Sequence, residues 1–484
     1  MHLQSRWQAI RTSENLAHWL LWAGMLLYSL IFALAAIYKL HSFWQGFDLG
    51  THEQVFWNTA HGRVAEVSMF GATHSYLGVD MIFVELLLAP FYALVQRTET
   101  LLVIQVVLAA SGALPLYLLA RDRMQSPWVG LVGGLIYLAA LPVQYTILYE
   151  FQIRAVGTVC FLWAFYAYER RSLWRCLLWG LLAVWTRSDA GFALALFGVY
   201  ALIERRDWRW VMLPMLLGGG WLLICLRILI PLFRPDAGFL YSFLYSWLGN
   251  TPLEMLLTLL TRPGYVLVNV LTGEKIRFLI ELFGPLLFLP LLRPQLLLLA
   301  APSLLLNMLS LDRIHFSIRY HYQAFVLPFL LIATIYALAD LHKRWPRVGR
   351  MLLALLVVVT LGSQLVLRTP LIALTTRPRD VARIELANRL VAAIPPEASV
   401  AASGSFGPHL ARRRTLYNFP GVVAQHADAA IYPPELADQG DMILADRREL
   451  DAAAKERLAQ MQASGQWATL NDEQDLVLLR RITP

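Results

Sequence analysis

Long runs of apolar residues recur along the chain, separated by short clusters of charged residues. Many of these runs approach the roughly 20 residues that an α-helix needs to cross the hydrocarbon core of a bilayer. The first run, residues 19–38, is too long for the core of a signal peptide and lacks a small-residue cleavage site, so we expect a retained helix. The other strong runs cover residues 99–120, 127–148, 155–168, 176–186, 190–203, 210–232, 278–292, 295–311, 322–339 and 351–368.

Two weaker apolar runs, residues 78–95 and 254–271, leave the number of crossings open, and the distribution of Lys and Arg decides it. Short cytoplasmic loops are enriched in these basic residues. If neither weak run crosses, the loops on one side hold 15 basic residues in 50, against 11 in 124 on the other side. We therefore predict about eleven transmembrane helices, with the N-terminus inside and everything after Arg368 outside.

The weak run at residues 78–95 contains Asp80, Glu85 and Pro90. A carboxylate that faces lipid is costly, and irregular backbone is tolerated at membrane depth only where protein or water covers it. We therefore expect a non-crossing helix that lies along or dips into the outer leaflet, with its two carboxylates turned toward a cavity on the outer face.

After residue 370 the pattern changes to that of a small soluble α/β domain. Residues 378–394 and 451–463 have helical periodicity, whereas residues 398–403 and 441–446 are short apolar runs typical of buried strands. A final hairpin is expected near the C-terminus.

The fold class is therefore mainly α, that of a polytopic membrane protein with a small C-terminal α/β domain. We predict a transmembrane domain over residues 1–370, with a long outer loop at residues 39–98. The soluble domain, residues 371–484, is expected on the extracytoplasmic side.

The composition agrees with this organisation. Hydrophobic residues make up 58% of the chain and charged residues only 15%, whereas soluble proteins carry about a quarter of charged residues. The formal net charge of +8 belongs to the membrane part and implies no nucleic-acid partner. Cys160, Cys176 and Cys225 lie in or beside apolar runs, where neither a disulfide nor a metal cluster is indicated.

With this topology, most of the unusual polar residues fall on the outer side, next to the ends of predicted helices. Ionisable groups at membrane depth are costly, and we therefore treat them as candidates for function. They are Asp48, His52, Glu53, His61, Arg63, His74, Asp80, Glu150, Arg154, Arg187, Asp189, Asp312, Arg313, His315, Arg319 and His321.

Structural roles compete with functional ones at these positions. An ion-pair network at helix ends explains Glu150, Arg154, Arg187 and Asp189 equally well. The histidines show no HxxH or HxxxH spacing, so metal binding is the less favoured reading of them. Function is favoured for Asp48, which lies between two glycines in the long outer loop.

Several stretches resemble one known family. They are FDLGTHEQVFWNTAHGR and LGVDMIFVELLLAPFYAL in the first outer loop, TRSDAG, and PPEASVAASGSFGPHLARRRTLYNFP in the C-terminal part. Over nearly its whole length the chain resembles the bacterial membrane proteins of domain-of-unknown-function family 2079, which is itself similar to the GT-C glycosyltransferases. The resemblance implies a protein of the bacterial cytoplasmic (inner) membrane. It also implies transfer of a sugar from a polyprenyl phosphate to an acceptor on the outer side.

The resemblance assigns the catalytic acidic position to Asp48 and a second acidic site to Glu53. The family pattern has a histidine at the positions of Asp80 and Gln152, an aspartate at Glu53, and a Lys-Glu-Asp stretch at residues 187–189. These departures leave a metal site and the reaction itself open, because an architecture can persist where a reaction is lost.

Two classes of function fit these observations. In the first, the protein is an inverting glycosyltransferase that uses a polyprenyl-phosphate-linked sugar, and Asp48 is the base that activates the acceptor. Its candidate substrate-binding residues are charged or imidazole side chains expected on the outer side, where they could hold the departing phosphate. These residues are Arg154, Arg187, Arg313, Arg319, His74, Asp80 and His321. A divalent metal is a candidate cofactor.

In the second class, the protein is a non-catalytic membrane scaffold, or a subunit of a larger membrane complex, that retains the helices without the reaction. An opening from Asp48 to the lipid distinguishes the two classes, because only the enzyme needs one. A transporter is less favoured, since the sequence shows no internal repeat.

Overall fold

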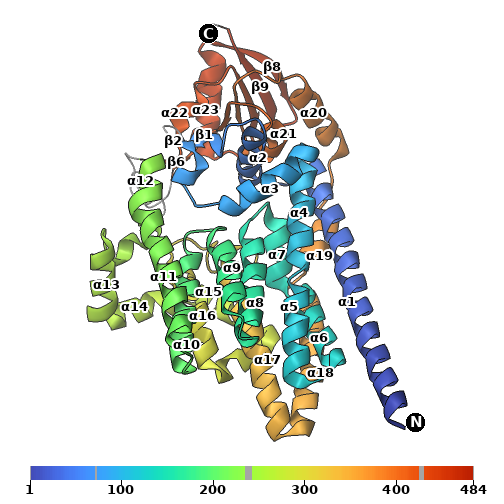
Figure 1. Cartoon of the computed structure of the whole chain (residues 1–484). Coiled ribbons are helices and arrows are strands. Elements are labelled where there is room, and N and C mark those ends of the chain that lie inside the picture. Colours follow the sequence, from blue (N-terminus) through green and yellow to red (C-terminus); the bar gives the residue numbers. More distant parts are fainter. Residues whose placement is uncertain (1, 71–72, 235–241, 424–429, 483–484) are drawn as a thin grey trace. The chain divides into compact units, whose positions relative to one another are not determined.

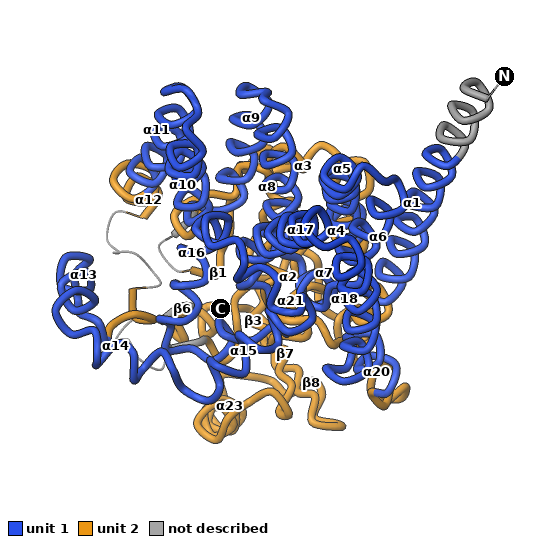
Figure 2. Tube along the Cα trace, turned by 90° about the horizontal axis from the view of Figure 1, so that it is seen from below, with its two compact units in different colours: residues 1–35, 103–225, 247–376 blue, residues 36–102, 226–246, 377–484 orange. Residues whose placement is uncertain are grey.

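The computed structural model describes residues 2–70, 73–234, 242–423 and 430–482, except for the side chains of residues 2–12, 73–74, 422–423 and 430–431. The chain forms two compact units, each assembled from separate stretches of sequence (Figure 2). Unit 1 comprises residues 1–35, 103–225 and 247–376, and unit 2 comprises residues 36–102, 226–246 and 377–484. The consecutive domains expected from the sequence, residues 1–370 and 371–484, stay a prediction.

Unit 1 is helical (Figure 1), and α17 (Leu327–Arg344) has the longest uninterrupted run of buried residues among its helices. Every residue from Leu327 to Leu338 is buried, as expected for a helix that other helices surround. The remaining helices of this unit are α5 (Ala113–Met124), α6 (Pro127–Ala139), α7 (Leu141–Tyr149), α8 (Arg154–Glu169), α9 (Leu173–Val184), α10 (Ala190–Ile203), α11 (Trp208–Ile224), α13 (Pro252–Thr261), α14 (Pro263–Val270), α15 (Gly273–Phe283), α16 (Pro294–Leu309), α18 (Pro346–Val366) and α19 (Pro370–Thr375).

Four helical segments in the described part of the chain are long and apolar enough to cross a membrane. They are Ser13–His41, Thr98–Met124, Trp208–Phe233 and Pro346–Thr375. The pair α6 and α7, bent by 43°, is a fifth candidate. Pro142 stands in the first turn of α7, where it has no N–H to continue the hydrogen bonding of α6. These segments support a polytopic membrane protein, but the eleven crossings predicted from the sequence are not confirmed.

Unit 2 contains a five-stranded sheet with the strand order β4-β3-β7-β9-β8. Its strands are β3 (Val400–Ala402), β4 (Leu416–Asn418), β7 (Met442–Asp446), β8 (Trp467–Glu473) and β9 (Leu476–Arg481). β3 runs parallel to β4 and β7, whereas β9 is antiparallel to β7 and β8. The two-residue turn between β8 and β9 has positive φ at Gln474 and Asp475, which is typical of a type I′ hairpin. The expected C-terminal sheet and final hairpin are therefore confirmed.

The outer loop predicted at residues 39–98 is a folded part of unit 2. It forms α2 (Phe47–Ala60), β1 (Glu66–Phe70), β2 (Thr73–Ser75) and α3 (Phe83–Leu94). The other elements of this unit are α12 (Ile230–Phe233), α20 (Val381–Ala392), α21 (Gly407–Leu410), β5 (Val422–Val423), β6 (Ala430–Tyr432), α22 (Pro434–Ala437) and α23 (Ala452–Ala463). α1 (His2–His41) enters unit 2 at its C-terminal end, and α4 (Thr98–Ala110) begins there.

α2 packs closely on α21, which belongs to the C-terminal part of the chain (Figure 1). Gly50 makes this approach possible, because a Cβ at that position would lie 2.7 Å from the carbonyl carbon of Gly407. A Cβ on Gly407 would in turn lie 2.7 Å from the ring of Phe47. The two glycines thus fix how closely residues 39–98 can pack against residues 377–484.

α1 ends in a Schellman turn. The N–H of Trp44 donates to the carbonyl of Lys39 at 3.1 Å, and the N–H of Phe43 donates to that of Leu40 at 2.9 Å. Phe43 has a φ of 55°, in the left-handed region where glycine is usual. Its ring stacks on His409 with centroids 4.0 Å apart, so packing against the C-terminal part holds this conformation.

Candidate functional site

The polar residues predicted from the sequence lie in both units. Unit 2 holds Asp48 and Glu53 on α2 and Asp80 just before α3, whereas Glu150, Asp189 and Asp312 belong to unit 1. Asp48 is the second residue of α2, whose N-cap is Gly46, and it is partly exposed. The sequence showed Asp48 between two glycines, and the structure shows that this segment begins a helix. A carboxylate in the first turn is stabilised by the partial positive charge of the helix N-terminus.

His52, one turn after Asp48, pairs with a carboxylate of α3. Its Nδ1 lies 2.8 Å from Oε1 of Glu85, and both side chains are buried. Asp80, also buried, accepts a hydrogen bond from the backbone N–H of Met81 at 2.8 Å. Glu85 therefore holds the His52 ring in place on the side of α2 that carries Asp48, because residues four apart share a helix face.

Glu53 is the most deeply buried of the predicted acidic residues. The hydroxyl of Tyr92 donates to its Oε1 at 3.2 Å, and Nε of Arg412 lies 3.8 Å from the same oxygen. Burial raises the pKa of Glu53 to about 7, although Thr98, Arg412 and Tyr92 lower it. The second acidic site of the family resemblance is thus a buried carboxyl that contacts α3 and the C-terminal part.

α3 has its polar side turned inward and its apolar side turned outward. Glu85 and Tyr92 are buried, whereas Leu87, Phe91 and Leu94 are 51%, 60% and 80% exposed. A soluble surface helix has the opposite arrangement.

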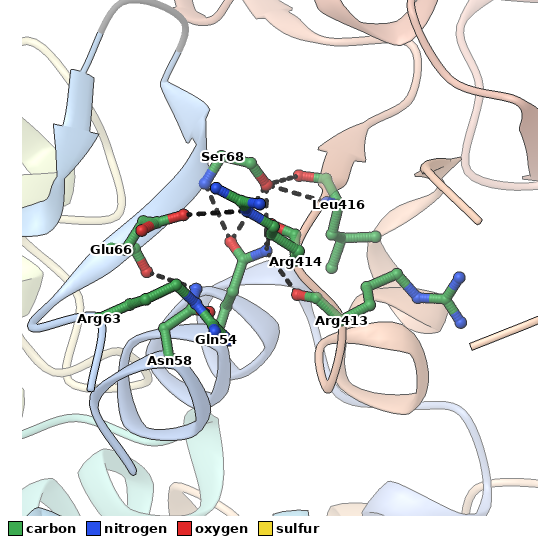
Figure 3. A network of polar contacts seen from close by, with 8 residues as sticks. All are labelled: Gln54, Asn58, Arg63, Glu66, Ser68, Arg413, Arg414 and Leu416. Carbon is green, nitrogen blue, oxygen red and sulfur yellow. Dashed lines mark hydrogen bonds and ion pairs between the residues drawn. The ribbon is translucent and has the colours of Figure 1, made fainter. Parts of the chain in front are cut away.

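A hydrogen-bond network fixes α2 and β1 to the C-terminal part (Figure 3). The amide nitrogen of Gln54 donates to the carbonyls of Arg413 and Arg414, each at 3.2 Å, and its amide oxygen accepts from the backbone N–H of Ser68 at 3.1 Å. The hydroxyl of Ser68 donates to the carbonyl of Leu416 at 2.7 Å and accepts from its N–H at 2.8 Å. The helix that carries Asp48 is therefore bonded through Gln54 both to β1 and to the backbone of residues 413–414.

In unit 1, two arginines share one carboxylate. Nη2 of Arg154, the first residue of α8, lies 3.5 Å from Oδ2 of Asp189, and Nε of Arg187 lies 3.3 Å from Oδ1. Burial alone would raise the pKa of Asp189, but the two guanidinium groups lower it below its ordinary value. The three side chains stay charged and carry a net positive charge. We call them the Arg154–Arg187–Asp189 cluster.

Aromatic rings and imidazoles adjoin this cluster. The ring of Tyr322 lies between His315 and His321, with centroid distances of 3.8 and 4.2 Å, and Arg154 lies 5.5 Å from the Tyr322 centroid. Burial, reinforced by Arg154 and Arg187, lowers the pKa of His315 to about 3. His315 is therefore neutral at physiological pH.

Three other predicted site residues lie outside these contacts. Arg313 is exposed and pairs with Glu274 at 3.3 Å. Arg319 is exposed, and its N–H donates to the hydroxyl of Ser317 at 3.3 Å. His74 lies in β2, and its side chain falls outside the described part of the structure.

Sequence reasoning missed Tyr92, Arg412 and Tyr322. A tyrosine within an apolar run and an arginine within a basic run carry no distinctive spacing. Tyr92 and Arg412 lie in stretches that resemble the family, which was the available signal for them, whereas Tyr322 was marked only by its place next to His321. In the described residues, no group of three or more His, Cys, Asp or Glu side chains is arranged to hold a metal ion.

Comparisons with known proteins agree with the family resemblance. Two solved structures have a similar fold: ArnT from Cupriavidus metallidurans bound to undecaprenyl phosphate, and the same protein in the apo state. Their TM-scores are 0.53 and 0.52, and each is 13% identical in sequence. Each alignment covers 94% of this chain and 98% of the ArnT chain. No curated protein matches the sequence. The family described as "Predicted membrane protein (DUF2079)" matches residues 9–478, and the chain belongs to it.

Proposed function

We propose that the protein is a GT-C-type glycosyltransferase that transfers a sugar from a polyprenyl phosphate to an acceptor at the extracytoplasmic face. One observation carries the proposal: 94% of the chain has a fold similar to that of ArnT, which has been solved with undecaprenyl phosphate bound. The charged residues described above supply groups that such a reaction needs.

The Arg154–Arg187–Asp189 cluster is the candidate site for the carrier phosphate. Its two guanidinium groups exceed its one carboxylate, so an anion would be attracted to it. Arginine suits this role because its planar group stays charged and donates two parallel hydrogen bonds to phosphate oxygens. The neutral His315 beside the cluster adds no competing positive charge.

Asp48 is the candidate base. It would take the proton from an acceptor hydroxyl while the oxygen attacks the anomeric carbon, and the polyprenyl phosphate would leave with the bonding electrons of the broken C–O bond. The pairing of His52 with Glu85 supports this assignment, because it fixes the face of α2 that carries Asp48. Asp80 and His321 are proposed to bind substrate, because ionisable groups at membrane depth are costly and are therefore candidates for function.

The predicted sidedness gains support from unit 2. Arg377 and Arg379 lie over the rings of Trp44 and Tyr38. Arg377 and Arg379 come just after the last candidate span, Pro346–Thr375. Trp44 and Tyr38 lie at the end of the first candidate span, Ser13–His41. Both spans then end on the same side of the membrane, which requires an odd number of crossings. Eleven crossings, with the C-terminal part outside and the N-terminus inside, meet this requirement.

Asp48→Asn tests the enzyme assignment. The amide keeps the shape of the side chain and removes the base, so transfer should fall by roughly 10² to 10⁴ while the protein still folds. Arg154→Lys should also lower transfer, because an ammonium group lacks the planar fork. The measurement is transfer from the polyprenyl-linked sugars of the host, with the exposed Glu385→Gln as the control.

The second candidate function, a non-catalytic scaffold, is favoured by the ion pairs within the Arg154–Arg187–Asp189 cluster. Such pairs can serve structure alone. Unchanged transfer in Asp48→Asn would leave the scaffold as the better proposal.

A further inference from the structure

Two arginines lie over aromatic rings at the C-terminal end of α1, among residues that the proposed reaction does not use. The Schellman turn folds the chain back so that Trp44 packs against Tyr38, with ring centroids 5.8 Å apart and planes at 80°. The guanidinium carbon of Arg377 lies 4.4 Å from the Trp44 centroid, and that of Arg379 lies 5.2 Å from the Tyr38 centroid. Two neighbouring aromatic rings thus hold two neighbouring cations.

The two guanidinium groups keep donors available for a ligand. Both arginines are exposed, and neither is paired with a carboxylate of the described residues. A cation–π contact engages one side of a guanidinium group, so the group can still donate N–H hydrogen bonds to an anion. Burial against the rings lowers the pKa of Arg377, which nevertheless stays protonated at any physiological pH.

Other charges around the pair leave it positive. Lys39 and His41 stand in the last turn of α1, and His41 lies 2.8 Å from Glu99. That carboxylate is therefore occupied by the imidazole. The negative end of the α1 dipole is balanced by these basic residues of its own last turn.

The position of the pair indicates what anion it meets. α1 and the α18–α19 segment are both candidate membrane spans, and the stacked residues lie where the first ends and directly after the second. Trp and Tyr at the end of a span are typical of the level of the lipid headgroups. Phosphate diesters of phospholipids are concentrated at that level.

We propose that Arg377 and Arg379, held on Trp44 and Tyr38, bind the phosphate of an anionic phospholipid headgroup. A phospholipid headgroup and a soluble phosphate both present a negatively charged phosphate oxygen to the arginines. The aromatic rings favour the lipid, because their apolar edges can contact the upper part of an acyl chain. This site is independent of the proposed glycosyl transfer.

The test uses the full chain in nanodiscs of phosphatidylcholine with a minority of phosphatidylglycerol. Native mass spectrometry then counts the lipids that stay bound after release from the disc. The wild type should retain phosphatidylglycerol preferentially. Arg377→Gln/Arg379→Gln should lose this preference by about 30-fold, because each basic residue near an anionic surface contributes about fivefold.

A matched control removes the same charge elsewhere in unit 2. Arg389→Gln/Arg480→Gln replaces two exposed arginines and should leave the preference unchanged. Arg377→Lys/Arg379→Lys keeps both charges and loses the planar guanidinium groups, so its preference should fall between those of the wild type and the glutamine variant. Equal retention by wild type and glutamine variant would overturn the site, and equal retention by wild type and lysine variant would overturn the role of the guanidinium groups. Displacement of the lipid by millimolar inorganic phosphate would overturn the assignment to a lipid.

Discussion

Glu53 is a carboxyl group without solvent exposure, held between Tyr92 and Arg412. Its pKa of about 7 in the folded chain lies above the ordinary 4.5, so the folded state binds the proton more tightly. The stabilisation is complete below about pH 4.5 and is lost as the pH rises through about 7. We expect the unfolding free energy of unit 2 to fall by on the order of 3 kcal/mol over this interval. Hydrogen-exchange protection of α2 measures it.

Glu53→Gln keeps the shape and removes the titration. The variant should therefore show a flat pH profile over the same interval. A wild-type profile that rises from pH 5 to pH 7 would contradict the assignment of this carboxyl.

Phe43 combines a left-handed backbone with a stacked ring. Phe43→Ala should destabilise the contact with His409 by about 3 kcal/mol, as expected for loss of a buried aromatic ring. Phe43→Gly loses the same ring but removes the conformational cost, so it should be more stable than the alanine variant by about 1 kcal/mol. Thermal unfolding of the purified protein measures both, and an alanine variant as stable as the glycine variant would show that the turn is unstrained.

At the scale of elements, the packing of α2 on α21 depends on Gly50. Gly50→Ala places a methyl group against backbone atoms of Gly407, which cannot move aside as a flexible side chain can. We expect a loss of about 1–3 kcal/mol, seen as faster proteolysis of residues 377–484. Gly362→Ala is the matched control, because a Cβ there has no atom within 4 Å and alanine favours the helix.

The sequence predicts elements best where one apolar run forms one helix. Residues 155–168 correspond to α8 because no proline interrupts the hydrogen bonding within them. Most of the run at 322–339 corresponds to α17, although its first residues, Tyr322–Phe325, form a separate 3₁₀ helix. The run at 278–292 instead ends its helix at Phe283, and Pro285 and Pro290 begin 3₁₀ turns. Residues 127–148 are likewise split into α6 and α7 before Pro142.

The sequence predicted which residues belong to the candidate site, but it did not predict which of them contact one another. Arg154, Arg187 and Asp189 come together because the start of α8 and the start of α10 meet, which no local pattern encodes. Arg313, from the same segment as His315 and His321, pairs with Glu274 instead. Charge and hydropathy place a residue at a helix end, whereas the packing of distant helices decides its partner.

At the scale of the whole molecule, the predicted sidedness can be tested directly. Ser464 is exposed at the end of α23, and the native cysteines Cys160, Cys176 and Cys225 are buried. Ser464→Cys should react with a membrane-impermeant maleimide in intact cells, because the C-terminal part is expected outside. Arg347→Cys, at the start of α18, should react only after the inner membrane is permeabilised, because the basic segment 340–350 between two predicted helices is expected inside. Labelling of Arg347→Cys in intact cells, with Ser464→Cys protected until permeabilisation, would show that the orientation is the opposite of the predicted one.

The bonds from Gln54 to the carbonyls of Arg413 and Arg414 join positions 359 and 360 residues apart in the chain. A ribosome that adds about 5–20 residues per second needs roughly 20 to 70 seconds to make the intervening segment. Throughout that time α2 lacks the backbone carbonyls that Gln54 binds and the guanidinium group that lies beside Glu53. We therefore expect unit 2 to complete its fold only late in synthesis, after residues 412–414 have been added.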